Sequence, residues 1–378
     1  MSDPRIERLA RVVIGYSLGL KKGDLVLIQA PSLAEPLVVE LVRAALDAGA
    51  NPAVRFSLPG VDHAYLSEAT EEHLRFLLPY AVDEMLALDA RIAVHAASNT
   101  RELSEIEPAK LRTRQDTNRP VMETYMQRSA AGELVWCVTA YPCTAFAQDA
   151  GMSLKQYEDF VFRAGWLHLA DPVAAWKDFS RKLHEIVDRL KDVRELRVLA
   201  VGTDLTVGVA GRTWIAADGD RNFPDGEVFT GPEETRTRGD VAFSFPAIFG
   251  GREVDGVRLR FEDGRVVKSE ASAGQSLLQE MLSVDDGASV LGEFAIGTNY
   301  NVDRYTKQIL FDEKIGGTFH MAVGAGYPET GSTNTSALHW DMVCDLRSGG
   351  EIQADGETIY RDGRFLPEFA PDLTPPAE

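Results

Sequence analysis

Residues 319–346 read FHMAVGAGYPETGSTNTSALHWDMVCDL and hold two of the seven histidines in the chain. Each histidine lies in an apolar run with the period-2 alternation of a β-strand. In the second run, the alternation puts His339 and Asp341 on one face, where an imidazole and a carboxylate can reach the same metal ion. The loop between the runs is rich in Gly, Ser, Thr and Asn, so we expect the strands that carry His320 and His339 to fold back on each other. The alternative is that both histidines are half-buried structural residues with backbone partners.

Length and composition are those of an ordinary globular protein. The 378 residues are enough for two domains, and 44% of them are hydrophobic. No apolar run approaches the ~20 residues that span a bilayer, and the N-terminal MSDPRIERLARVV does not have the pattern of a signal peptide. We therefore expect a cytoplasmic protein. The three cysteines form no CxxC pair, which indicates neither a disulfide framework nor a cysteine zinc site.

The formal net charge of −19 argues against nucleic acid and against an anionic membrane as partners, because binding them requires basic patches. The same charge is compatible with binding divalent cations. No GxGxxG, P-loop or GxSxG motif is present, so the sequence gives little support to a dinucleotide-binding, ATP-binding or serine-hydrolase function.

The first half of the chain alternates strand and helix patterns. The apolar run 25–30, the helical spacing of 35–48 and the run 52–58 form a β-α-β unit, for which we expect a right-handed parallel crossover. Strand patterns dominate from about residue 195, with Asp-Gly hairpin signals in FEDGRVV and YRDGRF. We therefore predict an α/β fold with two domains. The N-terminal domain (1–192) would have a mainly parallel sheet, and the C-terminal domain (193–378) would be β-rich.

Two glutamates of the second half lie in surroundings unusual for surface acids. Glu227 follows a Pro-Asp-Gly turn at the start of an apolar strand, and Glu293 lies in SVLGEFAIG between apolar residues. A carboxylate in such a run costs several kcal/mol unless it is paired or binds a metal. Exposure at the end of a strand is the alternative explanation for each of them.

Taken together, these segments resemble a known family. Four segments are similar, in order and in residue sequence, to the M29 family of metallo-aminopeptidases, the aminopeptidase T group. They are PDGEVFTGPE, LGEFAIG, DEKIGGTFHMAVGAGYPETG and NTSALHWDMV. The resemblance covers nearly the whole chain. It implies that the metal ligands are Glu227, Glu293, His320, His339 and Asp341. It also implies that Tyr327 is an active-site tyrosine and that the protein is a homodimer. We further expect Glu293 to be catalytic as well as a ligand, because it carries charge where water must be activated.

The donor chemistry supports this resemblance independently. Three carboxylates and two imidazoles make five ligands. That number is too small to complete two four-coordinate sites, and it is larger than the number of protein ligands that a single catalytic zinc ion usually has. We therefore expect two divalent ions about 3.5–4 Å apart, which would activate a water for attack on a peptide carbonyl. The nitrogen and oxygen donors suit Zn²⁺, Co²⁺ or Mn²⁺. The hydroxyl of Tyr327 could donate to the developing oxyanion; the alternative is a loop tyrosine whose ring only packs.

The sequence thus predicts a metal-dependent aminopeptidase that removes residues from peptides with a free N-terminus. One rival is another dinuclear hydrolase, an amidase or dipeptidase, with the same ligands and a different pocket. The other is a non-catalytic metal-binding scaffold. The presence of all six residue types, Tyr327 among them, weighs against the scaffold.

Overall fold

The computed structural model describes residues 3–374, which form two compact units. Within the described residues, one comprises 3–173 with Gly219–Phe223, and the other comprises Ala174–Asp218 with 224–374. Helix α9 (Pro172–Leu190) lies almost wholly in the second unit, where Arg189 Nη1 donates to the carbonyl of Glu368. The domain boundary that the sequence suggests, at residue 193, falls at the other end of this helix and stays a prediction.

The first unit is built on a parallel five-stranded sheet in the order β2-β1-β3-β4-β8. Helix α2 (Glu35–Asp47) connects the first two strands, which confirms the β-α-β unit expected from the sequence. Gly49, directly after this helix, has φ +78°, the left-handed conformation that commonly ends helices. The strands are β1 (Leu25–Pro31), β2 (Asn51–Ser57), β3 (Ala90–His95), β4 (Val135–Ala140) and β8 (Asn222–Phe223).

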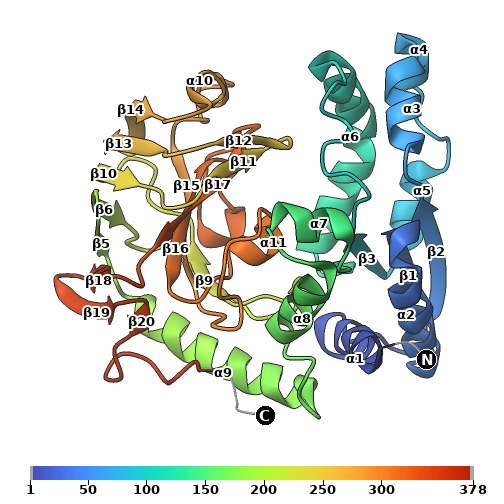
Figure 1. The fold of residues 1–378 in the computed structure, drawn as a ribbon, viewed down its shortest axis with the longest axis horizontal. Coiled ribbons are helices and arrows are strands. Elements are labelled where there is room, and N and C mark those ends of the chain that lie inside the picture. Colours follow the sequence, from blue (N-terminus) through green and yellow to red (C-terminus); the bar gives the residue numbers. More distant parts are fainter. Residues whose placement is uncertain (1–2, 375–378) are drawn as a thin grey trace. The chain divides into compact units, whose positions relative to one another are not determined.

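Helices pack against this sheet, as is usual for parallel sheets. Helices α5 (Ala81–Ala87) and α6 (Pro108–Ala130) contact each other (Figure 1). Met85 packs with Leu27 of β1 in one apolar cluster. Ser153 and Gln156 form the expected capping box at the start of α8. The remaining helices of the unit are α1 (Pro4–Val12), α3 (Val61–Glu68), α4 (Glu71–Leu74), α7 (Thr144–Asp149) and α8 (Leu154–Ala164). Across residues 3–374, no helix is both long enough and apolar enough to cross a membrane.

The second unit contains an eight-stranded antiparallel sheet in the order β14-β13-β10-β6-β5-β18-β19-β20. Both Asp-Gly hairpin signals are confirmed: Asp263 and Gly264 have φ +47° and +79°, and Asp362 and Gly363 have +49° and +79°. The strands are β5 (Glu195–Ala200), β6 (Thr203–Gly208), β10 (Arg238–Ala242), β13 (Arg258–Glu262), β14 (Arg265–Glu270), β18 (Glu351–Ala354), β19 (Glu357–Arg361) and β20 (Arg364–Phe365).

A second antiparallel sheet of this unit, with five strands in the order β17-β16-β15-β9-β7, carries the residues singled out from the sequence. Every residue of its strands β15 and β16 is buried, so both faces of these strands are covered. The strands are β7 (Ile215–Ala217), β9 (Glu227–Thr230), β15 (Leu291–Gly297), β16 (Thr318–Gly324) and β17 (His339–Asp345). A two-stranded ribbon, β11 (Ala247–Phe249) with β12 (Arg252–Val254), and helices α10 (Gln275–Leu282) and α11 (Ile309–Asp312) complete the unit.

The pairing of β15 with β16 contains a β-bulge at Gly292. Leu291 lies opposite Val323, but Glu293 lies opposite Ala322, so β15 has one extra residue at this point. In a regular ladder Glu293 would lie opposite Met321, on the other face of the sheet. The bulge therefore brings Glu293 onto the face that holds His320. Only glycine fits here, because a Cβ on residue 292 would lie 2.3 Å from the carbonyl oxygens of both Gly324 and Ala325.

We predict that Gly292→Ala destabilises the protein by about 1–3 kcal/mol, because the added methyl group forces the two strands apart. Metal affinity should fall with it, since Glu293 depends on the same bulge. Thermal unfolding and metal titration measure both effects. Gly15→Ala is the control, because a Cβ at Gly15 meets no atom within 4 Å. Wild-type stability in Gly292→Ala would show that the bulge does not constrain this strand.

Candidate metal centre

Strand register brings five predicted site residues to one face of the five-stranded sheet. Ala322, in the middle strand β16, lies opposite Glu293 on β15 and opposite Asp341 on β17. His320 and His339 lie two residues from Ala322 and Asp341 along their strands, so they share this face. Glu227, at the start of β9, lies opposite Gly297, four residues after Glu293, and completes the row.

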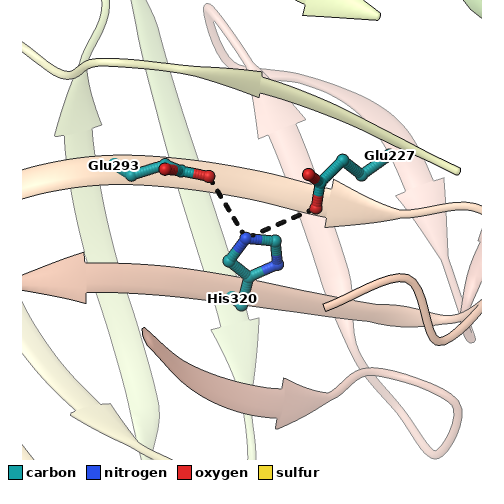
Figure 2. Close-up of side chains that lie close together, drawn as sticks. All are labelled: Glu227, Glu293 and His320. Atoms are coloured by element: carbon teal, nitrogen blue, oxygen red, sulfur yellow. Dashed lines mark hydrogen bonds and ion pairs between the residues drawn. The ribbon is translucent and has the colours of Figure 1, made fainter. Parts of the chain in front are cut away.

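The side chains converge at short distances. His320 Nε2 lies 3.3 Å from Glu293 Oε1 and 3.4 Å from Glu227 Oε2 (Figure 2). His339 Nε2 lies 3.5 Å from Glu293 Oε2 and 3.4 Å from Asp341 Oδ2. Each oxygen of Glu293 thus faces a different imidazole, and Glu293 is the residue common to both halves of the cluster.

Three overlapping groups of side chains have donor atoms close enough together to hold a metal ion. They are Glu227, Glu293 and His320; Glu293, His339 and Asp341; and Glu313, His320 and Asp341. Glu313, which directly follows helix α11, was not predicted from the sequence, where it is one of three consecutive charged residues in DEK and resembles solvated surface. The available signal was its place seven residues before His320 in a segment that already matched the family.

The cluster produces a strongly negative electrostatic environment. Burial alone would lower the pKa of His320, but Glu227, Glu293 and Glu313 raise it to about 9. For His339 the carboxylates of Asp341 and Glu293 likewise outweigh burial and raise the pKa to about 10. An environment that keeps protons on two buried imidazoles also favours other cations.

The pKa values of two of the carboxylates, Glu227 and Asp341, shift in opposite directions. Burial raises the pKa of Glu227 to about 8 in spite of nearby positive charges. Burial also opposes ionisation of Asp341, yet the imidazole of His339 holds the pKa of Asp341 at about 2. The difference follows from the neighbouring charges. At Glu227 the negative charges of Glu313 and Asp225 add to the effect of burial, whereas at Asp341 the cations His339, His320 and Lys314 all lower the pKa.

The unsatisfied atoms of the cluster fit a bound cation. Glu227 Oε2 and Asp341 Oδ1 are buried and accept no hydrogen bond from the described residues. Buried oxygens without donors are costly unless a cation is bound. His339 Nδ1 lies 2.8 Å from the carbonyl oxygen of Ala325, and donation to this oxygen leaves the Nε2 lone pair for a metal. Oxygen and nitrogen donors of this kind suit Zn²⁺, Co²⁺ and Mn²⁺ alike.

Tyr327 lies beside this cluster at the start of the loop from β16 to β17. Its ring packs edge-on against His339, with centroids 5.5 Å apart, and against Phe229 at the same distance. The residue is 44% exposed. Partial burial, then the negative charges of Glu293 and Asp341, raise the pKa of the phenol above its ordinary value, so the hydroxyl keeps its proton at neutral pH.

The loop that carries Tyr327 is held by a partly buried ion pair between Arg212 and Glu234. Glu234 Oε1 accepts hydrogen bonds from the backbone N–H of Thr333 at 2.7 Å and from its hydroxyl at 3.0 Å. Arg212 pairs with Glu234 and also donates to the carbonyl of Gly331. These contacts fix residues 331–333, four to six positions after Tyr327, and no local sequence pattern predicts them.

A second feature missed from the sequence is a buried lysine. Lys314, next to Glu313, is 1% exposed and its ammonium pairs with Asp225, Glu227 and Glu313. Burial opposes its charge, but the carboxylates, Glu227 first, raise its pKa well above the ordinary value. Its position in the charged triplet DEK, like that of Glu313, gave no sign of burial.

A buried group of carboxylates and imidazoles on a β-sheet, next to a protonated tyrosine, is the donor set of a metalloenzyme. The chain belongs to the M29 family of thermophilic metalloproteases, whose sequence model matches residues 2–365. The resemblance expected from the sequence is therefore confirmed, and the protein is a peptide hydrolase of a metal-dependent family.

Relatives of this chain cover nearly its full length. It is 30% identical to aminopeptidase T of Thermus thermophilus over 398 residues, with 96% of both chains covered. It is 28% identical to aminopeptidase 2 of Geobacillus stearothermophilus over 413 residues, which covers 97% of this chain and 99% of the relative.

Two solved structures have similar folds. Wild-type AmpT of Thermus thermophilus matches with a TM-score of 0.85 and 28% identity, over 96% of this chain and 99% of that one. This match supports the α/β fold expected from the sequence. A 2,5-dihydroxypyridine dioxygenase from Pseudomonas putida KT2440 matches with a TM-score of 0.62 and 13% identity, over 99% of each chain. At that identity the likeness concerns the fold alone.

Proposed function

We propose that this protein is an aminopeptidase that uses two divalent metal ions to hydrolyse the first peptide bond of peptides with a free N-terminus. One observation carries the proposal: in a chain of the M29 family, all five predicted ligands converge on one face of one sheet. The names of the relatives, which are aminopeptidases, supply the substrate class.

In this proposal Glu293 would contribute to both metal positions, because its two oxygens face different imidazoles. Glu227 and His320 would complete one position, and His339 and Asp341 the other. Glu313 lies near enough to His320 and Asp341 to add a further carboxylate oxygen. When bound, divalent ions polarise a carbonyl and lower the pKa of water, which makes it a nucleophile at neutral pH.

The side chains of the site would orient the substrate. The carboxylates can accept hydrogen bonds from an α-ammonium group, which would hold the N-terminus and bring the first peptide bond to the site. Positioning of this kind accounts for several kcal/mol of a barrier. Tyr327 carries its proton and lies beside His339, so it would donate a hydrogen bond to the oxyanion that develops at the peptide carbonyl.

A dinuclear amidase or dipeptidase with the same ligands is the nearest alternative, and it would differ only in which substrates fit. A non-catalytic metal-binding scaffold is disfavoured by membership of a metalloprotease family. Such a scaffold would also have no use for an ion pair that holds the Tyr327 loop.

We expect strict metal dependence. Chelation should abolish peptide hydrolysis, and Zn²⁺, Co²⁺ or Mn²⁺ should restore it, because the carboxylates alone cannot polarise a carbonyl. Activity with each metal, together with elemental analysis, identifies the effective ion and the number bound per chain. Full turnover in a preparation shown to contain no metal would contradict the proposal.

Tyr327→Phe should bind metal normally and lose about 10²–10³ in kcat, the usual effect of removing one oxyanion donor. Glu234→Gln should lower kcat by a smaller factor, because it weakens the contacts that fix the loop. Steady-state kinetics and metal titration separate the two properties. Glu185→Gln, which disrupts only an exposed pair with Arg181, is the control. An unchanged kcat, or loss of metal in Tyr327→Phe, would mean that the role of this residue is different.

The substrate proposal rests on recognition of a free N-terminus. An N-acetyl peptide lacks the α-ammonium group, so its kcat/KM should fall by orders of magnitude relative to the free peptide. Kinetics on the matched pair, with products identified by mass spectrometry, tests this. Equal rates, or first cuts within a long peptide, would exclude an aminopeptidase while leaving the metal centre intact.

We also propose a homodimer, as the family resemblance implies. Strand β2 is an edge strand, and its exposed Val54 and Phe56 are followed by exposed Leu58 and Val61. An open edge with apolar side chains is commonly covered by a partner. Light scattering should therefore give twice the 41.5 kDa chain mass, and Phe56→Glu should shift it towards the monomer. A monomer at micromolar concentration would contradict this proposal.

A further inference from the structure

Lys314 is a buried cation at the edge of the candidate metal centre. Its Nζ lies 2.5 Å from Glu227 Oε1, 3.0 Å from Glu313 Oε2 and 3.4 Å from Asp225 Oδ1. Removing an ammonium group from water costs several kcal/mol, and native proteins retain such a group only where partners surround it. Three carboxylates do so here, and two of them belong to the groups that could hold a metal.

The contact with Lys314 makes the two oxygens of the Glu227 carboxylate inequivalent. Oε1 accepts the hydrogen bond from Lys314. Oε2 accepts no hydrogen bond from the described residues and lies 3.4 Å from His320 Nε2 (Figure 2). A metal ion beside His320 therefore meets one free oxygen of Glu227, while the other is already taken.

The backbone holds the lysine where it is. The N–H of Lys314 donates to the carbonyl of Phe311 at 2.9 Å, and its own carbonyl accepts from the N–H of Asn299 at 3.1 Å. The side-chain amide of Asn299 also donates to the carbonyl of Asp225 at 2.8 Å. One asparagine thus links the segment of the ammonium group to the segment of one of its partners, which fixes the distance between them.

Charge gives the lysine a second effect. The group contains five carboxylates: Asp225, Glu227, Glu293, Glu313 and Asp341. When all are ionised, one ammonium group leaves four negative charges, equal and opposite to the charge of two divalent ions. Without the lysine, two ions would leave one negative charge uncompensated in a buried site, which is costly.

We propose that Lys314 is a positioning residue of the metal centre: it occupies Glu227 Oε1, so that Glu227 binds metal through Oε2 alone, on the side of His320. The inference rests on the proposed metal centre and extends it to a residue that does not touch metal. A carboxylate restricted to one oxygen favours ions of low coordination number, such as Zn²⁺ and Co²⁺. Larger ions such as Ca²⁺ often take both oxygens of a carboxylate.

Lys314→Met tests this, because methionine keeps most of the side-chain length and removes the charge. The chelator-treated variant should lose affinity for Co²⁺ by about 10–100-fold, the usual effect of removing a partner of a ligand. The visible spectrum of bound Co²⁺ should weaken, since a two-oxygen Glu227 raises the coordination number. Lys307→Met is the control: Lys307 lies in the same stretch but pairs with Glu253 at 2.8 Å and is partly exposed.

A double-mutant cycle asks whether Lys314 acts through Glu227. If it does, Lys314→Met should have little further effect on Co²⁺ affinity in the Glu227→Gln background. If Lys314→Met does not fold, Lys314→Arg replaces it in the experiment, because arginine keeps the positive charge but places it at a different position. This variant should fold and show an altered Co²⁺ spectrum with a smaller loss of affinity.

The proposal is overturned if a folded Lys314→Met protein has wild-type Co²⁺ affinity and spectrum, since the lysine would then have no effect on how Glu227 binds metal. Tighter binding would also overturn it, because the ammonium group would then compete with the metal. Additive effects in the cycle would exclude action through Glu227. None of these readouts needs peptide hydrolysis, so a failure of the aminopeptidase assignment is distinguishable from a failure of this inference.

Discussion

The candidate metal centre depends on one irregularity in a β-ladder. The bulge at Gly292 places Leu291 and Glu293 on opposite faces of the sheet, although they are two residues apart. Strand alternation would otherwise put them on the same face and bury Glu293 among apolar side chains. Without the extra residue, β15 would be an ordinary core strand. With it, the strand places the carboxylate of Glu293 at the centre of the cluster. The close approach of two carbonyl oxygens restricts this position to glycine.

Opposite charges in close contact keep this centre buried. Each carboxylate of the group has an imidazole or an ammonium group within 4 Å: Glu293 contacts both histidines, Asp341 contacts His339, and Lys314 contacts the others. Buried charges are tolerated in proteins when they are mutually compensated. The arrangement also explains why the two imidazoles have raised pKa values while that of Asp341 is lowered.

Much of the fold could be read from periodicity, and the site only in part. The β-α-β unit, the two Asp-Gly hairpins and the strands that carry His320 and His339 follow from local patterns that the structure retains. Glu313 and Lys314 could not be found this way, because a charged triplet in sequence resembles surface whatever lies around it in space. The bulge was equally hidden, since LGEFAIG is compatible with either register and only the pairing with β16 decides between them. Clustering of the five predicted ligands was expected from family resemblance. Only the distances in the structure show that Glu293 is the carboxylate common to both halves of the cluster.

The order of the ligands along the chain has a consequence for folding kinetics. Strands β15, β16 and β17 follow one another as an antiparallel meander and bring together Glu293, His320, His339 and Asp341. Glu227 comes from β9, more than sixty residues earlier, and pairs with the free edge of β15. Contacts between distant segments require closure of longer loops and form later than local ones. The meander can therefore assemble most of the centre while β15 still has an open edge, and the arrival of β9 both closes that edge and delivers the last carboxylate.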